Sequence, residues 1–500
     1  MRKLNISYRA LFSFLVVLAL LVLVACSPGS TPVEVDPAAV DAAEEAAAAA
    51  QATADAALAA LEAAAEGDEE AQAQLEAQLA AAEAALAEAQ EAAAAAAAEA
   101  EEAASAAAEE VMEEEAEPIL IGFTSDASGQ YANSGAMDRR GMMLAIKEFN
   151  EKGGVLGRPI EFIHYDTETN PATGTRIAER MITQDGVGFL IGAVSSGVAN
   201  AVSQVAQEHG VIYFNTNSSS PTESGENCHR TKFVWDGHGG NFSNATVAGA
   251  VESFGDQWVL LTNDYVWGHE TSAATRALAE PAGANIVDEL LVPQNTRDFS
   301  SYLLSIQQLN PNVVAAAVGG DDLKALRIQV VDQQMDQDIA WINNQQDWPD
   351  VYGVPPFGLF GTTWYYGLDL PGVDEFVAKY QEEYPDSALR VPGNVYYNGY
   401  MAMRTLLEAI EVAGTTNNHE IIKALEGWQW TAEERMQHHD AWIDPDTHQV
   451  QQTIYLGTAN ANPSEEYDIY EIVTAVSPED AMNQSDCVLE SFEDTPVFEP

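Results

Sequence analysis

The sequence predicts an α/β fold built on open parallel sheets, because short apolar runs alternate with helical segments from residue 118 onward. Runs that are apolar nearly throughout fit strands that helices cover on both faces. The first strands are expected at residues 119–123, 160–165 and 189–194, with an amphipathic helix that ends at 150–154. Loops of small and polar residues follow two of these strands, at 128–135 and 195–197. Open parallel sheets bind ligands at such strand ends, so this segment predicts a small-molecule cleft.

The part of the chain from residue 117 to 500 exceeds the usual size of one hydrophobic core, which favours two lobes. The α/β alternation continues along it. Further strands are expected at 258–262, 285–288 and 313–319, and further helices at 300–309 and 323–334. Two such sheets imply two lobes with a cleft between them.

The N-terminus has the pattern of a bacterial lipoprotein signal. Arg2 and Lys3 precede an apolar run, which ends in Leu-Val-Ala directly before Cys26. A charged start, a short apolar run and small residues before the break are typical of a secretory signal. We therefore expect a signal peptide over residues 1–25, a lipid on Cys26, a linker over 26–36 and a protein held at the outer side of a membrane. The alternative is a membrane-spanning anchor, for which the run is short.

The composition is strongly acidic, with a formal net charge of -57 and a sequence pI of about 4.1. Proteins that bind nucleic acid need Lys and Arg patches to displace counterions, so the charge argues against a nucleic-acid partner. Residues 37–117 consist almost only of Ala, Glu, Gln, Asp and Leu, which are mostly strong helix formers. This segment predicts a helical stalk. Its heptad of leucines is interrupted, so a coiled coil, a single solvated helix and a disordered tether all stay open.

Two cysteines remain once Cys26 carries lipid. Cys228 and Cys487 are expected to form a disulfide, because exported proteins often join such a pair. The alternative is two free, buried thiols. A disulfide would attach the C-terminal tail to the loop that follows the first lobe.

Several motifs together resemble one known family. They are Gly129-x-Tyr-Ala-x-x-Gly135, the helix end at residues 150–159, Asp166, Gly192 to Ser196, and Asn217 to Pro221. This set resembles the type I solute-binding proteins of ABC importers, and within them the branched-chain amino acid and amide (Leu/Ile/Val-binding) group. The resemblance covers nearly all of residues 118–480.

That resemblance implies two α/β lobes joined by three crossovers, which close on a ligand and then dock on a permease. The first lobe would contain residues 118–236 and 364–438. The second would contain 237–363 and 439–480, followed by a tail over 481–500. Ligand contacts that both lobes make exist only in the closed form, so the ligand shifts the population toward closure.

The resemblance also implies a ligand site. Ser196 and Ser219 stand where the family's hydroxyls meet the ligand carboxylate, helped by free N–H groups at helix starts. Asn217 matches the carbonyl that accepts from the ligand amino group, and Trp267 matches an aromatic lid. Ser134, Val194, Ser195, Ser218 and Val395 fall at the neighbouring loop and wall positions. The alternatives are that the serines are turn and helix-cap residues and that Trp267 only packs in the core.

One position departs from the family pattern. Amino acid binders place a carboxylate of the second lobe against the ligand ammonium, but Gln345 occupies that position here. Asp321, or Asp347 after a small shift of register, would replace it; a helix cap is the alternative role of Asp321. Ligands without an ammonium group stay open, namely amides, urea, aromatic acids and keto acids.

The remaining motifs indicate no chemistry. His438 and His439 are adjacent and lack a further ligand at a fixed spacing, so they predict a surface loop and not a metal site. No nucleophile elbow, P-loop or dinucleotide-binding fingerprint occurs. We therefore expect no enzyme activity, no cofactor and no metal. The two functions that remain are delivery of a solute to an ABC permease and ligand sensing through a separate receptor.

Overall fold

The computed structural model describes residues 116–500 except 248 and 484, together with seven isolated helical positions between 70 and 84. The chain divides into two units, residues 1–115 and 116–500. The predicted signal peptide, the lipidation site Cys26 and nearly all of the stalk lie outside the described residues and stay predictions. No described helix is long and apolar enough to cross a membrane.

The first sheet is entirely parallel and has the order β2-β1-β3-β4-β5. Its strands are β1 (Ile119–Phe123), β2 (Ile160–His164), β3 (Phe189–Gly192), β4 (Ile212–Asn215) and β5 (Lys232–Val234). The connecting helices are α4 (Ala132–Asn150), α5 (Pro171–Thr183) and α6 (Ser196–His209), and η1 (Pro221–Ser224) precedes β5. The strand order reverses between β1 and β3, which is the position where such sheets bind ligands.

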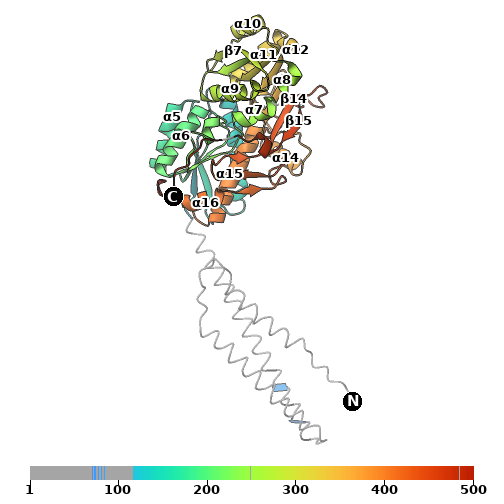
Figure 1. The fold of residues 1–500 in the computed structure, drawn as a ribbon. Coiled ribbons are helices and arrows are strands. Elements are labelled where there is room, and N and C mark those ends of the chain that lie inside the picture. The colour runs from blue at the N-terminus through green and yellow to red at the C-terminus, as the bar shows by residue number, and fades with distance from the viewer. Residues whose placement is uncertain are drawn as a thin grey trace. The chain divides into compact units, whose positions relative to one another are not determined.

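The second sheet has seven strands in the order β15-β14-β10-β9-β8-β6-β7. Five are parallel: β6 (Gln257–Asn263), β7 (Asn285–Val292), β8 (Val313–Ala317), β9 (Ala340–Asn343) and β10 (Leu359–Thr362). The antiparallel pair β14 (Ile454–Ala459) and β15 (Tyr470–Val476) extends one edge. The predicted α/β fold with two lobes is confirmed, and each lobe is one sheet with its covering helices (Figure 1).

Eight helices accompany the second sheet. They are α7 (Gly239–Val247), α8 (Ala250–Phe254), α9 (Val266–Ala279), α10 (Ser300–Leu309), α11 (Gly320–Asp332), α12 (Met335–Asp338), α13 (Trp348–Val351) and α17 (Pro478–Ala481). The central strand β8 is fully buried, whereas β7 is an edge strand with several exposed residues. Helices α9, α11 and α13 begin after β6, β8 and β9, so their first turns face the other lobe.

The chain returns to the first lobe after β10. Helices α14 (Val373–Glu383), α15 (Asn394–Ala413) and α16 (Asn418–Leu425) pack there, and α15 lies along α4. Glycine permits this close approach: a Cβ on Gly141 would lie 2.1 Å from the carbonyl oxygen of Tyr396. Val234 of β5 forms an isolated parallel bridge with Gln449, so Gln449, which was expected in the second lobe, lies beside the first sheet. The other lobe boundaries stay predictions. Next to Gln449 lies a small sheet of β11 (Gln429–Trp430), β12 (Ala441–Ile443) and β13 (Val450–Gln451).

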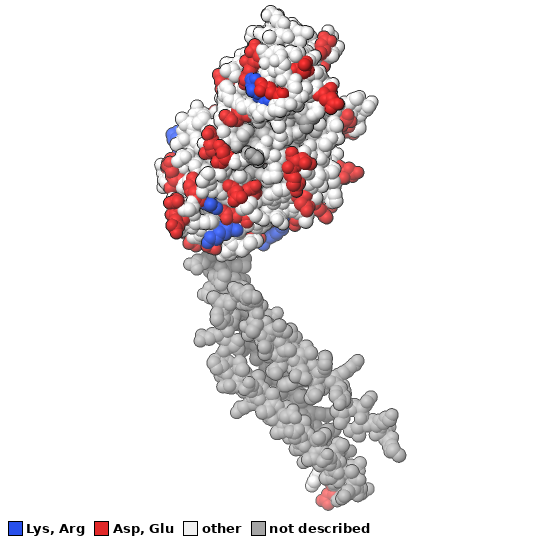
Figure 2. Space-filling model, in the orientation of Figure 1, with Lys and Arg blue, Asp and Glu red and all other residues white. Residues whose placement is uncertain are grey.

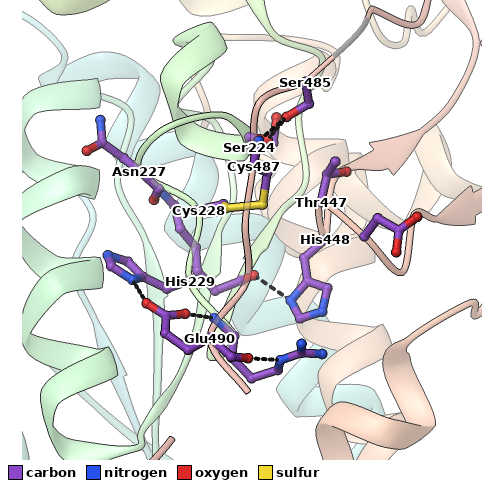
Figure 3. The surroundings of a disulfide bond; sticks show 12 residues. Ser224, Asn227, Cys228, His229, Thr447, His448, Ser485, Cys487 and Glu490 are labelled. Carbon is purple, nitrogen blue, oxygen red and sulfur yellow. Dashed lines mark hydrogen bonds and ion pairs between the residues drawn. A yellow bond between two sulfur atoms is a disulfide. The ribbon is translucent and has the colours of Figure 1, made fainter. Parts of the chain in front are cut away.

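The predicted disulfide between Cys228 and Cys487 is confirmed, with an S–S distance of 2.01 Å (Figure 3). Helix α17 packs on α7 of the second lobe, and further along the chain the disulfide holds the C-terminal tail against the first lobe. Nearby, Glu490 accepts hydrogen bonds from the His229 ring at 2.7 Å and from the Arg230 backbone N–H at 2.8 Å. The tail therefore adds a further link between the lobes beyond the crossovers.

Acidic side chains are spread over the face of residues 116–500 that Figure 2 shows, and basic side chains occupy fewer places on it. The whole sequence contains 78 Asp and Glu against 21 Lys and Arg. A surface of one sign keeps proteins soluble and repels polyanions.

Candidate functional site

A small cavity of about 20 Å³ lies between the two lobes. It is lined by Tyr131, Val194, Asn217, Ser219, Tyr265, Trp267, Gly319, Leu323, Gln345, Asp347 and Asp350. Most of these residues follow the carboxyl ends of β3, β4, β6, β8 and β9, where parallel sheets place ligand contacts. The volume is roughly that needed by one water molecule, so a larger ligand requires the lobes to separate.

Hydrogen bonds across the cleft hold the lobes together. Ser219 of the first lobe donates its hydroxyl to Oε1 of Gln345 in the second. On the loop before α4, Nε2 of Gln130 donates to the Gly319 carbonyl oxygen at 2.9 Å. Ser134 donates its hydroxyl to Oδ1 of Asp350 at 3.0 Å. These bonds exist only while the lobes touch, so they belong to the closed arrangement.

Aromatic rings form one wall of the cavity. Tyr265 lies with its ring centre 6.0 Å from that of Trp267 and 6.4 Å from that of Tyr131, whose hydroxyl it contacts. Trp267 is only 4% exposed, and its Nε1–H has no hydrogen-bond partner among the described residues. Buried Trp N–H groups usually have a partner. Five buried indole N–H groups of the described residues lack a partner, those of Trp235, Trp267, Trp348, Trp364 and Trp430, and of these five tryptophans only Trp267 lines the cavity.

Two carboxylates of the second lobe face the cavity. Asp347 accepts from Nδ2 of Asn394 at 2.7 Å and from Nε2 of Gln345 at 3.3 Å, and burial raises its pKa to about 6. Asp350 accepts from Ser134 and from the Gly320 backbone N–H. Burial, and after it the charge of Asp347, raises the pKa of Asp350 to about 8. Removing a carboxylate from water disfavours its charged form, which explains the direction.

A third buried carboxylate lies behind them. Asp236 accepts from Thr363 and Asn398, both at 3.0 Å, and from Nε2 of Gln345 at 2.9 Å. Burial, and after it the charge of Asp347, raises the pKa of Asp236 well above its ordinary value. Gln345 thus touches Asp236, Asp347 and Ser219, and its amide orients the hydrogen bonds of this part of the site.

A polar network fixes the first-lobe wall. Asp138 accepts from the side chains of Ser125 at 2.7 Å, Thr216 at 3.0 Å and Asn217 at 2.9 Å, and burial raises its pKa to about 7. Asp126 accepts from the backbone N–H of Val194 at 3.1 Å. Asn217 and Val194 therefore keep fixed positions beside the cavity.

The serines after β3 and β4 take different places. Ser219 lines the cavity, whereas Ser195, Ser196 and Ser218 are buried beside it and are not part of the lining. The hydroxyls of Ser196 and Ser218 lie 2.9 Å apart, and Ser218 donates to Glu223 at 2.7 Å. Ser196 and Ser218 therefore form a second layer behind the cavity lining, and their hydroxyls already bond to each other.

Two further predicted positions lie outside the lining. Val395 is fully buried in the core at the start of α15. Asp321 pairs with Arg297 at 2.9 Å and accepts from Nδ2 of Asn133 at 3.4 Å. Ser134 meets the site through its bond to Asp350. Of the predicted positions, Val194, Asn217, Ser219, Trp267 and Gln345 line the cavity.

Some lining residues were not predicted as site residues, namely Tyr131, Tyr265, Gly319, Leu323, Asp347 and Asp350. Asp347 was weighed as a replacement for Gln345. Tyr131 belongs to the motif Gly129-x-Tyr-Ala-x-x-Gly135, and Tyr265 lies two residues before Trp267. No three His, Cys, Asp or Glu side chains of the described residues gather as metal ligands.

The comparisons with known proteins decide the family. A family model described as "Periplasmic binding protein" matches residues 118–464, which is most of the folded unit. The chain belongs to the periplasmic binding protein family. Members of this family bind solutes for ABC transporters, and the predicted resemblance to its type I, Leu/Ile/Val-binding group is confirmed.

This periplasmic binding protein has similar relatives in several bacteria. It is 26% identical over 317 residues to "Leu/Ile/Val-binding protein homolog 1" of Brucella abortus (strain 2308), a match that covers 61% of this chain and 82% of that protein. Among solved structures, an ABC transporter substrate-binding protein from Sphaerobacter thermophilus has a TM-score of 0.63 and 25% identity, covering 72% of this chain and 98% of that one. A periplasmic binding protein from Burkholderia mallei has a TM-score of 0.67 and 21% identity, covering 76% and 98%, and shows the fold alone.

Proposed function

We propose that this chain is the extracytoplasmic substrate-binding lipoprotein of an ABC importer. It captures a small solute that carries both a carboxylate and an ammonium group, an amino acid, and delivers it to a permease. The single observation that carries the proposal is the cavity at the strand ends of both sheets. Hydrogen bonds between the two lobes close this cavity. A site built from both lobes binds its ligand most tightly in the closed form, and a permease would recognise that form.

The two sides of the cavity differ in chemistry. The first lobe supplies neutral polar groups, the hydroxyl of Ser219 and the amide of Asn217, and we assign the ligand carboxylate to this side. The second lobe supplies Asp347 and Asp350, which suit an ammonium group. Asp347 thereby supplies the negative charge opposite the ligand ammonium, which the neutral side chain of Gln345 does not supply. Val194, Leu323 and Trp267 would contact the apolar part of the side chain, as in a branched-chain amino acid.

Amine-free ligands fit this site less well. An aromatic acid, a keto acid, an amide or urea would leave Asp347 and Asp350 buried without a cationic partner, and buried charges are costly unless they are paired. The sensing alternative uses the same site and differs in the protein that recognises the closed form. Export through the signal peptide and anchoring through a lipid on Cys26 complete the proposal.

The proposal is tested by calorimetric titration of the full chain, purified in detergent, with leucine, isoleucine and valine. The matched ligands are 4-methylpentanoate and 4-methyl-2-oxopentanoate, which keep the leucine side chain and carboxylate but lack the amine. Binding of any amino acid with at least tenfold preference over its amine-free analogue supports the proposal. Tighter binding of the amine-free acids contradicts the ammonium assignment, and the absence of binding by every amino acid contradicts the function.

A further inference from the structure

The cavity gathers more carboxyl groups than the single ammonium of a neutral amino acid can pair with. Asp347 and Asp350 both line it, and they are 8% and 4% exposed. Asp236 is fully buried one layer behind and hydrogen-bonds to Gln345 of the lining. Burying several carboxylates in one place is costly unless cations or protons accompany them.

Neutral groups make every hydrogen bond that these three carboxylates accept from the described residues. Asp347 meets two side-chain amides, Asp350 meets a hydroxyl and a backbone N–H, and Asp236 meets a hydroxyl and two amides. None of the three takes part in an ion pair within the part of the chain that the structure describes. The residues that the structure describes therefore form no ion pair with these carboxylates.

Two arginines of the second lobe, Arg327 and Arg297, have other partners. Arg327 donates to Gln346 at 3.0 Å and to the Phe357 carbonyl oxygen at 2.9 Å, and its guanidinium lies over the Phe357 ring. Arg297 pairs with Asp321 and, at 3.5 Å, with Asp322. Neither arginine lines the cavity.

An independent feature also indicates a ligand in this place. The Nε1–H of Trp267 is a buried donor at the cavity with no partner among the described residues. A ligand carboxylate oxygen would satisfy it. The rings of Tyr131, Tyr265 and Trp267 border the same space, and aromatic faces attract cations. A ligand that carries both an acceptor and a cation would match these groups.

We propose, on the basis of the function proposed above, that the solute is a basic amino acid, whose α-ammonium and cationic side chain pair with Asp347 and Asp350. Both donors to Asp347 meet its Oδ1, so its Oδ2 accepts no hydrogen bond from a described residue and is free for the ligand. A neutral amino acid would leave one of the two carboxylates without a cation. A basic amino acid neutralises both.

The test compares ligands of equal shape and different charge on the unmodified full chain. Arginine is titrated against citrulline, and lysine against norleucine, by calorimetry at pH 7. We expect arginine or lysine to bind at least tenfold more tightly than its neutral counterpart. Because this comparison uses the wild-type protein, it does not depend on whether a variant folds.

Variants locate the effect. Asp347→Asn keeps the Oδ1 that accepts both amide hydrogen bonds, and we expect it to reduce the preference for the charged ligand to less than threefold, as we expect for Asp350→Asn. The matched control is Asp264→Asn, which changes a carboxylate next to Tyr265 that is 49% exposed and pairs with His269. This control keeps the wild-type preference. Circular dichroism and thermal melting show whether each variant is folded.

The outcomes separate the two proposals. Preference for leucine, citrulline or norleucine over arginine and lysine overturns the basic-ligand inference and leaves amino acid binding intact. A preference for basic amino acids that survives in both Asn variants overturns the assignment of Asp347 and Asp350. Failure of all amino acids to bind overturns both proposals.

Discussion

Ser219 of the first lobe donates its hydroxyl to Oε1 of Gln345 of the second lobe, and both side chains line the cavity. The bond joins segments 126 residues apart in the sequence. Opening of the lobes breaks it and exposes a hydroxyl on one side and an amide on the other. The closed arrangement thus uses the same groups that a ligand would bind.

Replacing Ser219 by Ala is expected to weaken binding of the cognate amino acid roughly tenfold, because a hydrogen bond to a charged group contributes about 1.5 kcal/mol or more. Calorimetric titration measures the dissociation constant. The neighbouring Ser220→Ala is the control, since Ser220 lies outside the lining and its hydroxyl contacts Thr222. Equal affinity of Ser219→Ala and wild type would exclude Ser219 from ligand binding.

The free indole N–H of Trp267 predicts a specific loss. Trp267→Phe retains an aromatic wall and removes the donor, so we expect ligand affinity to fall about fivefold to tenfold, the value of one hydrogen bond. Trp267→Ala also removes the wall and should weaken binding further. If the Phe variant binds as tightly as wild type, the N–H has no role and Trp267 acts only through its ring.

The raised pKa values of Asp347 and Asp350 predict that their burial costs stability as the pH rises. Both groups bind protons more strongly in the folded than in the unfolded chain, so their contribution to stability is fully present below about pH 4 and is lost as the pH rises through about 6 for Asp347 and about 8 for Asp350. The titratable groups that interact with them are Asp236, Asp321, Tyr131 and Tyr265, none of which is cationic.

Urea unfolding of the full chain without ligand, at several pH values between 4 and 8, measures this effect. The difference in unfolding free energy between wild type and Asp350→Asn cancels all other titrating groups. We expect wild type to lose stability relative to the variant as the pH rises. A difference that stays constant over this range would show that Asp350 titrates normally.

The disulfide predicts a stability effect away from the cavity. Cys228 and Cys487 are 259 residues apart in sequence, and crosslinks that close long loops stabilise proteins by about 2–5 kcal/mol. The double variant Cys228→Ser/Cys487→Ser is expected to unfold at a lower denaturant concentration, with ligand affinity unchanged within about twofold. Cys26→Ser serves as the control. An unchanged unfolding midpoint would mean that Glu490 and the rest of the tail contacts suffice to hold the C-terminus.

Much of the fold followed from local patterns. Apolar runs predicted β1, β3, β6 and β8, because strands buried between helices have no polar face to interrupt the run. Strand β2 was also predicted, although it is an edge strand with Glu161 and Phe162 exposed. The polar loops after β1 and β3 marked the ligand edge of the first sheet. The disulfide followed from counting cysteines in an exported chain. All of these features are encoded by residues that are close together in the sequence, or by composition.

The choice of side chains within the site did not follow from local patterns. Asp321 and Asp350 both lie in the first turn of a second-lobe helix, α11 and α13, yet Asp321 pairs with Arg297 and Asp350 faces the cavity. The rotation of each helix about its axis decides whether a carboxylate in its first turn faces the cavity. Only tertiary packing sets that rotation. Tertiary packing also decides that Val395 belongs to the core and that Gln449 lies beside the first sheet.

The sequence by itself determined the α/β class, the family, the cysteine pair and the strand ends that carry the site, because each depends on short-range pattern or composition. Tertiary structure alone decided which residues meet in the cavity. Tyr131, Tyr265 and Asp350 come from segments far apart in the chain, and their contact depends on how two lobes close on each other. Two separate segments bring three carboxyl groups together, Asp236 on one and Asp347 and Asp350 on the other, and no local pattern encodes that meeting.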